Sequence, residues 1–208
     1  MSPSDPTSGH RVKRPQTDGF HCWTPDEVDR FKAHWPLGTR ERLALILLVE
    51  TGLRKSDMVR LGRQHVRDDG NIKFKTRKTG AEVVIPMSDE FKDTIAASRT
   101  GDLIFFATVN GSPMEPTSFG NWFAGACVAA GVPGRAHGLR KRRATNLVEI
   151  DATLDELNVT MGWTGYKSAS HYTKTKNKDK LANRLKDKLR THPPAPSNPV
   201  RATGKKDE

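Results

Sequence analysis

The strongest constraint on the fold is a run of seven apolar residues, LALILLV, from Leu43 to Val49. It lies in a helical segment, Arg40 to Glu50, and apolar residues at consecutive positions cover all sides of a helix rather than one stripe. Gly52 follows at a position where a left-handed glycine commonly ends a helix. The sequence therefore predicts a helix that is buried on most sides and that other elements must surround.

The chain changes from a helical to a strand-like period after residue 70. Between 72 and 77, Ile, Phe and Thr alternate with Lys and Arg, and a Thr-Gly pair at 79 and 80 precedes a Val/Ile-rich segment that ends at Pro86. This pattern is typical of an antiparallel β-hairpin, which we place within residues 64–86, with a basic face. Because helical patterns cover most of the remaining chain, the predicted fold class is α+β and mainly α.

Capping signals and apolar spacing place the other elements. The predicted segments are a helix from Thr24 to about Trp35, a short helix from Ser56 or Asp57 to Gly62, helices at 88–98, 118–131 (capped by Thr117 or Ser118), 137–149, 153–160, 168–174 and 178–190, and an extended segment at 103–106. Residues 1–20 and 191–208 are polar and proline-rich, which is typical of disordered tails. With 208 residues in all, we expect one domain at 21–190 between two tails.

The charge favours a polyanionic partner. Lys and Arg number 35 against 24 Asp and Glu, a net charge of +11, and such a surplus is typical of nucleic-acid-binding proteins. The alternative is a basic protein without such a partner, since part of the surplus lies in the chain ends. Two cysteines, Cys22 and Cys127, support neither a disulfide framework nor a zinc site. With no membrane-length apolar run and a polar N-terminus, we expect a cytoplasmic protein. If its polyanionic partner is DNA, the bound protein would be associated with the nucleoid.

Four short segments carry residues suited to phosphate chemistry. They are TGLRKSD around Arg54, KTGAEVVIP from Lys78, HGLRKRRAT from His137, and MGWTGYKSASHYTK, which includes Tyr172. His137 and Arg140 are three apart on a predicted helix and therefore share a face. Each residue also has an ordinary interpretation, as a surface cation or a packing tyrosine. Only the whole set, cations and a phenol, indicates a site for a phosphodiester.

Together these segments resemble the catalytic domain of the tyrosine recombinase, or phage integrase, family over about residues 23–190. T-G-L-R before an acidic residue is similar to the first arginine box, K-T-G before a strand to the hairpin lysine, and H-x-L-R before A-T to the second box. The resemblance implies six catalytic residues, namely Arg54, Lys78, His137, Arg140, Trp163 and Tyr172. Lys141 stands where a second histidine is common. An N-terminal DNA-clamping domain of the kind usual in the family has no room here, which implies a fragment or a reduced form.

The resemblance also implies a mechanism and an activity. Tyr172 would attack the scissile phosphate of DNA and form a 3′-phosphotyrosyl link, while Arg54 and Arg140 would clamp the phosphate and favour the phenolate. We therefore expect a site-specific recombinase or integrase that breaks and rejoins DNA. The alternatives are relaxation of DNA by a type IB topoisomerase and DNA binding without cutting on the same fold.

The remaining residues of the implied site have supporting roles. Lys78 would protonate the leaving 5′-oxygen, His137 would act as acid or base, and Trp163 would donate its indole N–H to a phosphate oxygen. Asp57 is interpreted either as a partner that orients the cations or as a helix-start residue. Neither a metal nor another cofactor is expected, because the cations already supply the positive charge.

The expected partners follow from the same resemblance. They are double-stranded DNA, further copies of the chain in a tetramer on paired recombination sites, and an accessory DNA-bending protein. DNA contacts are expected from a set of basic residues on the hairpin and the second box, namely Lys73, Lys75, Arg77, Lys141, Arg142 and Arg143. Leucines four apart at 181, 185 and 189 form a stripe that would dock on the same chain or on a neighbouring one.

Overall fold

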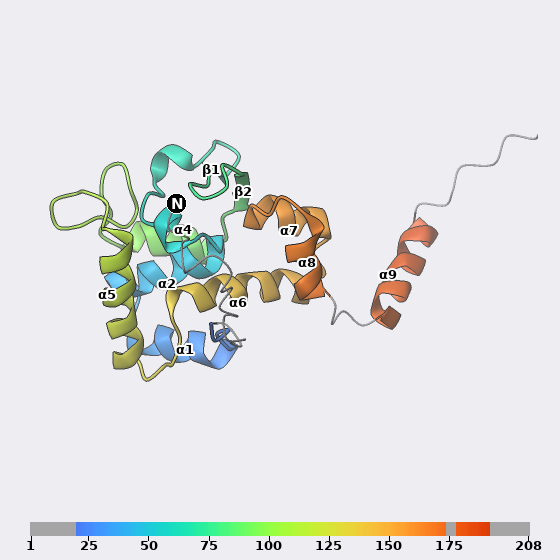
Figure 1. The fold of residues 1–208 in the computed structure, drawn as a ribbon, viewed down its shortest axis with the longest axis horizontal. Coiled ribbons are helices and arrows are strands. Elements are labelled where there is room, and N and C mark those ends of the chain that lie inside the picture. The colour runs from blue at the N-terminus through green and yellow to red at the C-terminus, as the bar shows by residue number, and fades with distance from the viewer. Residues whose placement is uncertain (1–19, 174–177, 192–208) are drawn as a thin grey trace, which may run out of the picture.

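The computed structural model describes residues 20–173 and 178–191, which form a mainly helical fold with one two-stranded sheet (Figure 1). The helices are α1 (Pro25–His34), α2 (Arg40–Thr51), α3 (Lys55–Met58), α4 (Asp89–Ala97), α5 (Pro116–Ala129), α6 (Ala136–Glu149), α7 (Leu154–Met161), α8 (Tyr166–Thr173) and α9 (Lys178–Thr191), with a 3-10 turn at Arg63–His65. The tails expected at 1–20 and 191–208 lie outside the described residues, apart from Phe20 and Thr191. Among the described residues, no helix is both long and apolar enough to cross a bilayer.

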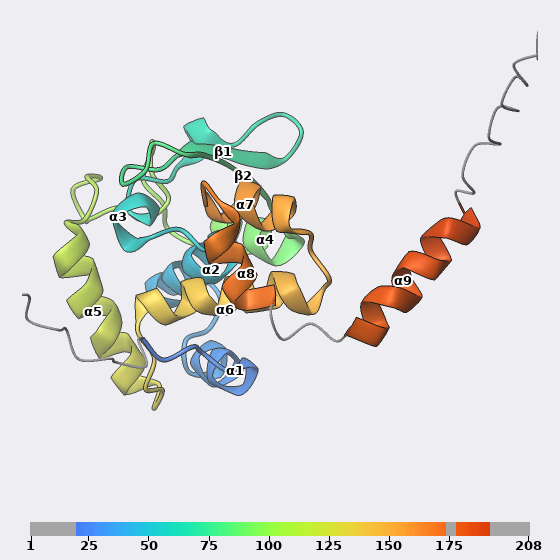
Figure 2. The ribbon, with the colours of Figure 1, turned by 45° about the vertical axis from the view of Figure 1, so that its right-hand side comes forward.

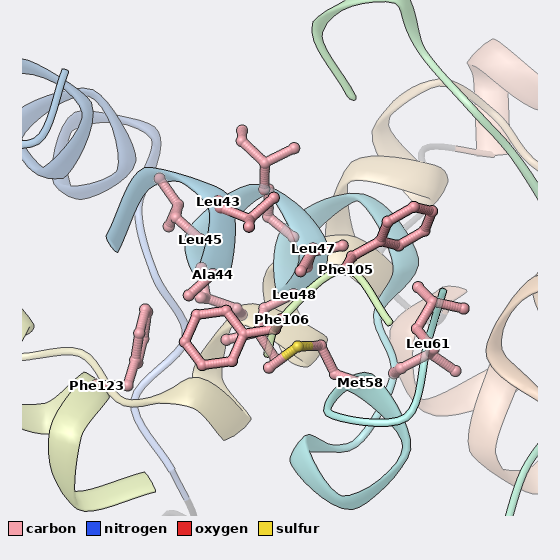
Figure 3. Close-up of a cluster of buried hydrophobic side chains, with 14 of the residues drawn as sticks. Leu43, Ala44, Leu45, Leu47, Leu48, Met58, Leu61, Phe105, Phe106 and Phe123 are labelled. Atoms are coloured by element: carbon pink, nitrogen blue, oxygen red, sulfur yellow. The ribbon is translucent and has the colours of Figure 1, made fainter. Parts of the chain in front are cut away.

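Helix α2 is the centre of the core, as its apolar run predicts. The side chain of Thr39 caps its start by accepting from the Arg42 N–H, and Gly52 ends it in the left-handed conformation at φ 61°. Every residue from 43 to 49 is buried. Figure 3 shows its leucines near Met58 of α3 and near Phe105 and Phe123, which come from distant parts of the chain. A helix with no exposed apolar face thus holds the surrounding helices at fixed positions.

The hairpin has the predicted register and an inner apolar face. Strand β1 (Asn71–Lys75) pairs antiparallel with β2 (Glu82–Pro86), so that Ile72 lies opposite Ile85 and Lys75 opposite Glu82. The isoleucines are buried and Lys75 is exposed. Helix α7 packs against β2, while the lysines of β1 and residues 77–80 of the turn are exposed.

Three of the predicted elements differ in the structure. Helix α3 begins at Lys55 and spans one turn, because the carboxylate of Asp57, a candidate helix cap, is buried and accepts instead from the Arg77 backbone N–H. Segment 103–106 forms no strand; its Phe105 N–H bonds the Leu61 carbonyl at 2.8 Å while its phenylalanines enter the core. Helix α5 starts at Pro116, before the predicted caps.

The chain at residues 20–24, which we term the N-terminal strap, crosses the start of α6. The buried Trp23 donates its indole N–H to the Arg135 carbonyl at 3.1 Å. At Gly138, a Cβ atom would lie 2.1 Å from the His21 carbonyl oxygen. The glycine of the HGLR box is therefore required by the close approach of two backbones.

Helix α9 lies outside the body formed by the other elements, as the two views in Figures 1 and 2 show. Arg184 joins it to the body by donating to the Asp151 carbonyl at 2.7 Å. Of the predicted leucine stripe, Leu185 and Leu189 are exposed by 57% and 54%. The side chain of the third member, Leu181, lies outside the described residues.

Two helical glycines provide a test of the strap contact. Alanine in place of glycine inside a helix normally stabilises by about 0.5–1 kcal/mol, and Gly125→Ala in α5 should do so, because its new Cβ would meet nothing within 4 Å. Gly138→Ala should instead lower the free energy of unfolding by about 1–3 kcal/mol, since its Cβ clashes with the strap. Urea unfolding of both variants measures this. Equal stabilisation by the two substitutions would contradict the close crossing.

Candidate active site

Arg54 is positioned by the end of the central helix. Gly52 turns the chain out of α2, the buried Leu53 anchors it, and Arg54 then occupies the N-cap position of α3. Its Nη1 atom is buried and has no hydrogen-bond partner among the described residues. An unpaired donor on a cation is costly to bury, so this guanidinium group suits an anionic ligand.

Arg140 is the most buried cation of the site, with 7% of its surface exposed. From α6 it donates through Nη1 to the Gly52 carbonyl at 2.5 Å and through Nη2 to the Met161 carbonyl at 2.7 Å. These acceptors stand at the carboxyl ends of α2 and α7, where helix dipoles favour positive charge. Burial, together with the charge of Arg54, lowers the pKa of Arg140 to about 10. The group therefore stays charged at neutral pH.

Trp163 and Tyr172 form an aromatic pair beside Arg140. Gly162 ends α7 in the left-handed conformation, Trp163 follows, and the Tyr172 ring from α8 stacks on the indole with centroids 5.5 Å apart. The guanidinium carbon of Arg140 lies 6.0 Å from the centroid of the same indole, within range of a cation–π contact. Trp163 thus contacts both the phenol and the buried cation.

Burial changes the pKa of the Tyr172 phenol more than the charge of Arg140 does. It raises the pKa of Tyr172, the nearby Cys22 thiol adds to this effect, and the positive charge of Arg140 opposes it. The sequence-based expectation that arginines favour the phenolate is therefore outweighed in this structure. At neutral pH the phenol is protonated, so an attack by its oxygen requires a group that accepts the proton.

His137 is suited to accept a proton. It lies in the first turn of α6, and although partly exposed it is covered well enough for burial to lower its pKa. The positive charges of Arg140, Lys141 and Arg54 lower this pKa further. The imidazole is therefore neutral at physiological pH, the form that can act as a base.

One cavity of about 300 Å³ brings most of these groups together. Its walls are formed by His137, Arg140, Lys141, Trp163, Ser168 and Tyr172. Four of the six predicted catalytic residues thus share one cavity, and Arg54 is close enough for its charge to act on His137 and Arg140. The motifs did not indicate Ser168. Its position four residues before Tyr172 on one helix is the signal that would have found it.

Lys78, like Arg54, does not line the cavity. Its side chain is exposed on the hairpin turn. That turn is attached to the site by Asp57, which is fully buried and whose Oδ1 accepts from the Arg77 N–H at 2.8 Å. Asp57, which is three residues after Arg54, therefore fixes the backbone of the hairpin turn.

The predicted DNA-contact residues separate into two groups. On the hairpin, Lys75 and Arg77 are exposed, and Lys73 forms an exposed ion pair with Glu82 at 3.0 Å. These three cations are therefore exposed to solvent, as a contact with DNA would require.

On α6, only one of the three adjacent cations faces the cavity. Lys141 lines it. Arg142 pairs with Glu149 at 2.8 Å and Arg143 with Glu50 at 3.6 Å, and the two arginine side chains are 14% and 12% exposed. Arg142 and Arg143 are thus engaged within the protein. Within the described part of the chain, no three His, Cys, Asp or Glu side chains gather as a possible metal site.

The sequence of this chain also matches a known family. The model of the phage integrase family matches residues 23–179. The chain belongs to this family. A comparison with curated proteins by sequence gave no significant match.

Solved structures of integrases and recombinases share the fold. XerA recombinase matches with a TM-score of 0.63 and 17% identity over 87% of this chain and 67% of its own. A lambda integrase dimer bound to a COC′ core site matches with a TM-score of 0.64 and 23% identity, over 78% of this chain and 50% of its own. The Tn1549 transposon integrase in complex with circular intermediate DNA matches with a TM-score of 0.65 and 18% identity, over 80% of this chain and 66% of its own. This integrase-family chain therefore spans between half and two thirds of these relatives.

The hydrogen bond from Arg77 to Asp57 can be tested without DNA. Asp57→Ala removes the acceptor and should lower the free energy of unfolding by about 1–3 kcal/mol. It should also speed trypsin cleavage after Arg77 and Lys78, because the turn loses its attachment to α3. Asp89→Ala, at a carboxylate whose side chain is 94% exposed, is the control and should change stability by less than about 0.5 kcal/mol. Unchanged stability and trypsin sensitivity in Asp57→Ala would contradict this role.

Proposed function

We propose that this chain is the catalytic domain of a site-specific DNA recombinase or integrase, and that it breaks and rejoins DNA through a 3′-phosphotyrosyl link on Tyr172. The observation that carries the proposal is the shared cavity, in which a phenol, a neutral imidazole and a buried guanidinium meet. Family membership supports the same chemistry.

Arg140 and Arg54 would bind the scissile phosphate. Two guanidinium groups can neutralise the non-bridging oxygens and hold the phosphorus in line with the phenol oxygen. The carbonyls that bind Arg140 set its orientation in advance, so little reorganisation is needed as charge develops on the phosphate. The unpaired Nη1 of Arg54 supplies a further donor.

The proton steps follow from the states of the side chains. The Tyr172 oxygen forms a bond to phosphorus, its proton passes to the neutral His137, and the bond from phosphorus to the 5′-oxygen breaks. Lys78 would donate a proton to that 5′-oxygen. Because Lys78 is on the exposed turn, we propose that the turn closes over DNA to deliver it. Rejoining reverses these transfers.

Double-stranded DNA is the proposed partner, with further copies of the chain assembled on it. A lambda integrase tetramer bound to a Holliday junction has the same fold, with a TM-score of 0.60 and 20% identity. The exposed Leu185 and Leu189 on α9 supply an apolar stripe for contact between copies. With DNA as the substrate, we place the protein at the nucleoid.

The central test is a trapped covalent adduct. The protein is incubated with a pool of nicked genomic fragments, denatured, and examined for DNA attached to protein. We expect adducts from the wild-type chain and from Tyr166→Phe, which alters the only other tyrosine, and none from Tyr172→Phe, because phenylalanine has no nucleophilic oxygen. An adduct from Tyr172→Phe would overturn the assignment. Relaxation of any supercoiled plasmid without strand exchange would indicate a topoisomerase, and binding without adducts a non-cutting protein.

The leaving-group acid can be identified separately. Lys78→Ala should slow cleavage by roughly 100-fold or more, a typical loss for a general acid. A substrate with sulfur in place of the 5′-bridging oxygen should restore the rate, because a thiolate leaves without a proton. Lys75→Ala on the same hairpin is the matched control and should require no rescue. Rescue of Lys75→Ala but not Lys78→Ala would transfer the role to Lys75.

A further inference from the structure

The N-terminal strap is held across the start of α6 by several contacts. Trp23 is 1% exposed and bonds the Arg135 carbonyl, and the imidazole of His21 pairs with the Glu27 carboxylate at 2.8 Å. The His21 carbonyl also approaches Gly138 so closely that no side chain fits there. These contacts of residues 21 and 23 bring Phe20, the residue before them, next to His137.

Phe20, at the end of the strap, packs on a residue of the candidate site. Its ring centroid lies 4.6 Å from that of His137, with the two planes at 51°. This distance is within the range of aromatic pairs, and the tilt is between the stacked and edge-to-face arrangements. Phe20 itself remains 56% exposed, so its ring adds little to the core. Its contact with His137, which lines the cavity, is better explained by what the ring does to the imidazole.

The groups around His137 come from several elements. Arg140 and Lys141 on α6 and Arg54 before α3 are positively charged and disfavour an imidazolium. Tyr172 of α8 lines the same cavity. On the strap, His21 is already paired with Glu27, and the Cys22 thiol lies 4.0 Å from the Thr145 hydroxyl. The Phe20 ring therefore adds an apolar cover to an imidazole whose charged neighbours are cations.

We propose that Phe20 is a positioning residue, which holds the His137 ring toward the cavity and keeps water from one of its faces. This inference rests on the proposed function for the role of His137 in proton transfer. A fixed and partly desolvated imidazole stays neutral and oriented, so it is ready to take the proton of the phenol. No motif of the second box contains this residue, because Phe20 lies more than a hundred positions before His137.

The first test follows the imidazole directly and needs no DNA. The titration of the His137 ring is measured by NMR in the wild-type chain and in Phe20→Ala, with its signal assigned by loss in His137→Gln. We expect the pKa of His137 to rise toward its usual value in Phe20→Ala, because water gains access to the ring. Phe20→Tyr should restore the wild-type titration, and Leu37→Ala, at an apolar side chain exposed by 54%, should leave it unchanged. An identical titration in Phe20→Ala would overturn the proposal.

The second test measures cleavage across pH. Phe20→Ala should slow adduct formation most at mildly acidic pH, and by less than the roughly 100-fold or more expected from loss of the base itself. The acidic limb of the rate profile should move to higher pH, since the fraction of neutral imidazole falls. Phe20→Tyr should restore both. A uniform loss at all pH values would indicate a merely structural role and overturn the proposal. If the wild-type chain forms no adduct, the proposed function fails, and the NMR titration still decides the role of Phe20.

Discussion

The site depends on the two hydrogen bonds by which Arg140 joins the carboxyl ends of α2 and α7. A buried guanidinium group is tolerated only where acceptors and partial negative charge surround it. The end of each helix supplies a carbonyl, and each end is closed by a left-handed glycine, Gly52 or Gly162. Through this one side chain, the segments that carry Arg54 and Trp163 are held at fixed positions around α6.

Burial then reinforces the protonation state that His137 and Tyr172 have at neutral pH. It lowers the pKa of His137 and raises that of Tyr172, while Arg140 remains charged despite the lowered pKa. The resting site thus contains a neutral base, a protonated phenol and a fixed cation. Such a combination suits transfer of a proton within the cavity during attack on phosphorus, because no group has to change its state beforehand.

Local signals predicted much of the fold and of the site. The capping boxes at Thr24 and Thr153, the apolar run of α2 and the hairpin alternation are all present in the structure. Each depends on neighbours within a few residues. Where a side chain has a distant partner the prediction failed, as at Asp57, which bonds the hairpin turn instead of starting a helix. Arg142 and Arg143 likewise share a basic run with Lys141, but the helix turns them toward Glu149 and Glu50.

The sequence by itself determined which chemical groups are present, their order along the chain and the elements that carry them, because those depend on short-range pattern and residue type. The tertiary structure decided which guanidinium is buried, where the hairpin turn stands and which ring covers His137. Those features depend on contacts such as Arg140 with Gly52 and Phe20 with His137. Residues about ninety or more positions apart meet only when the whole core packs, so no local pattern records their contact.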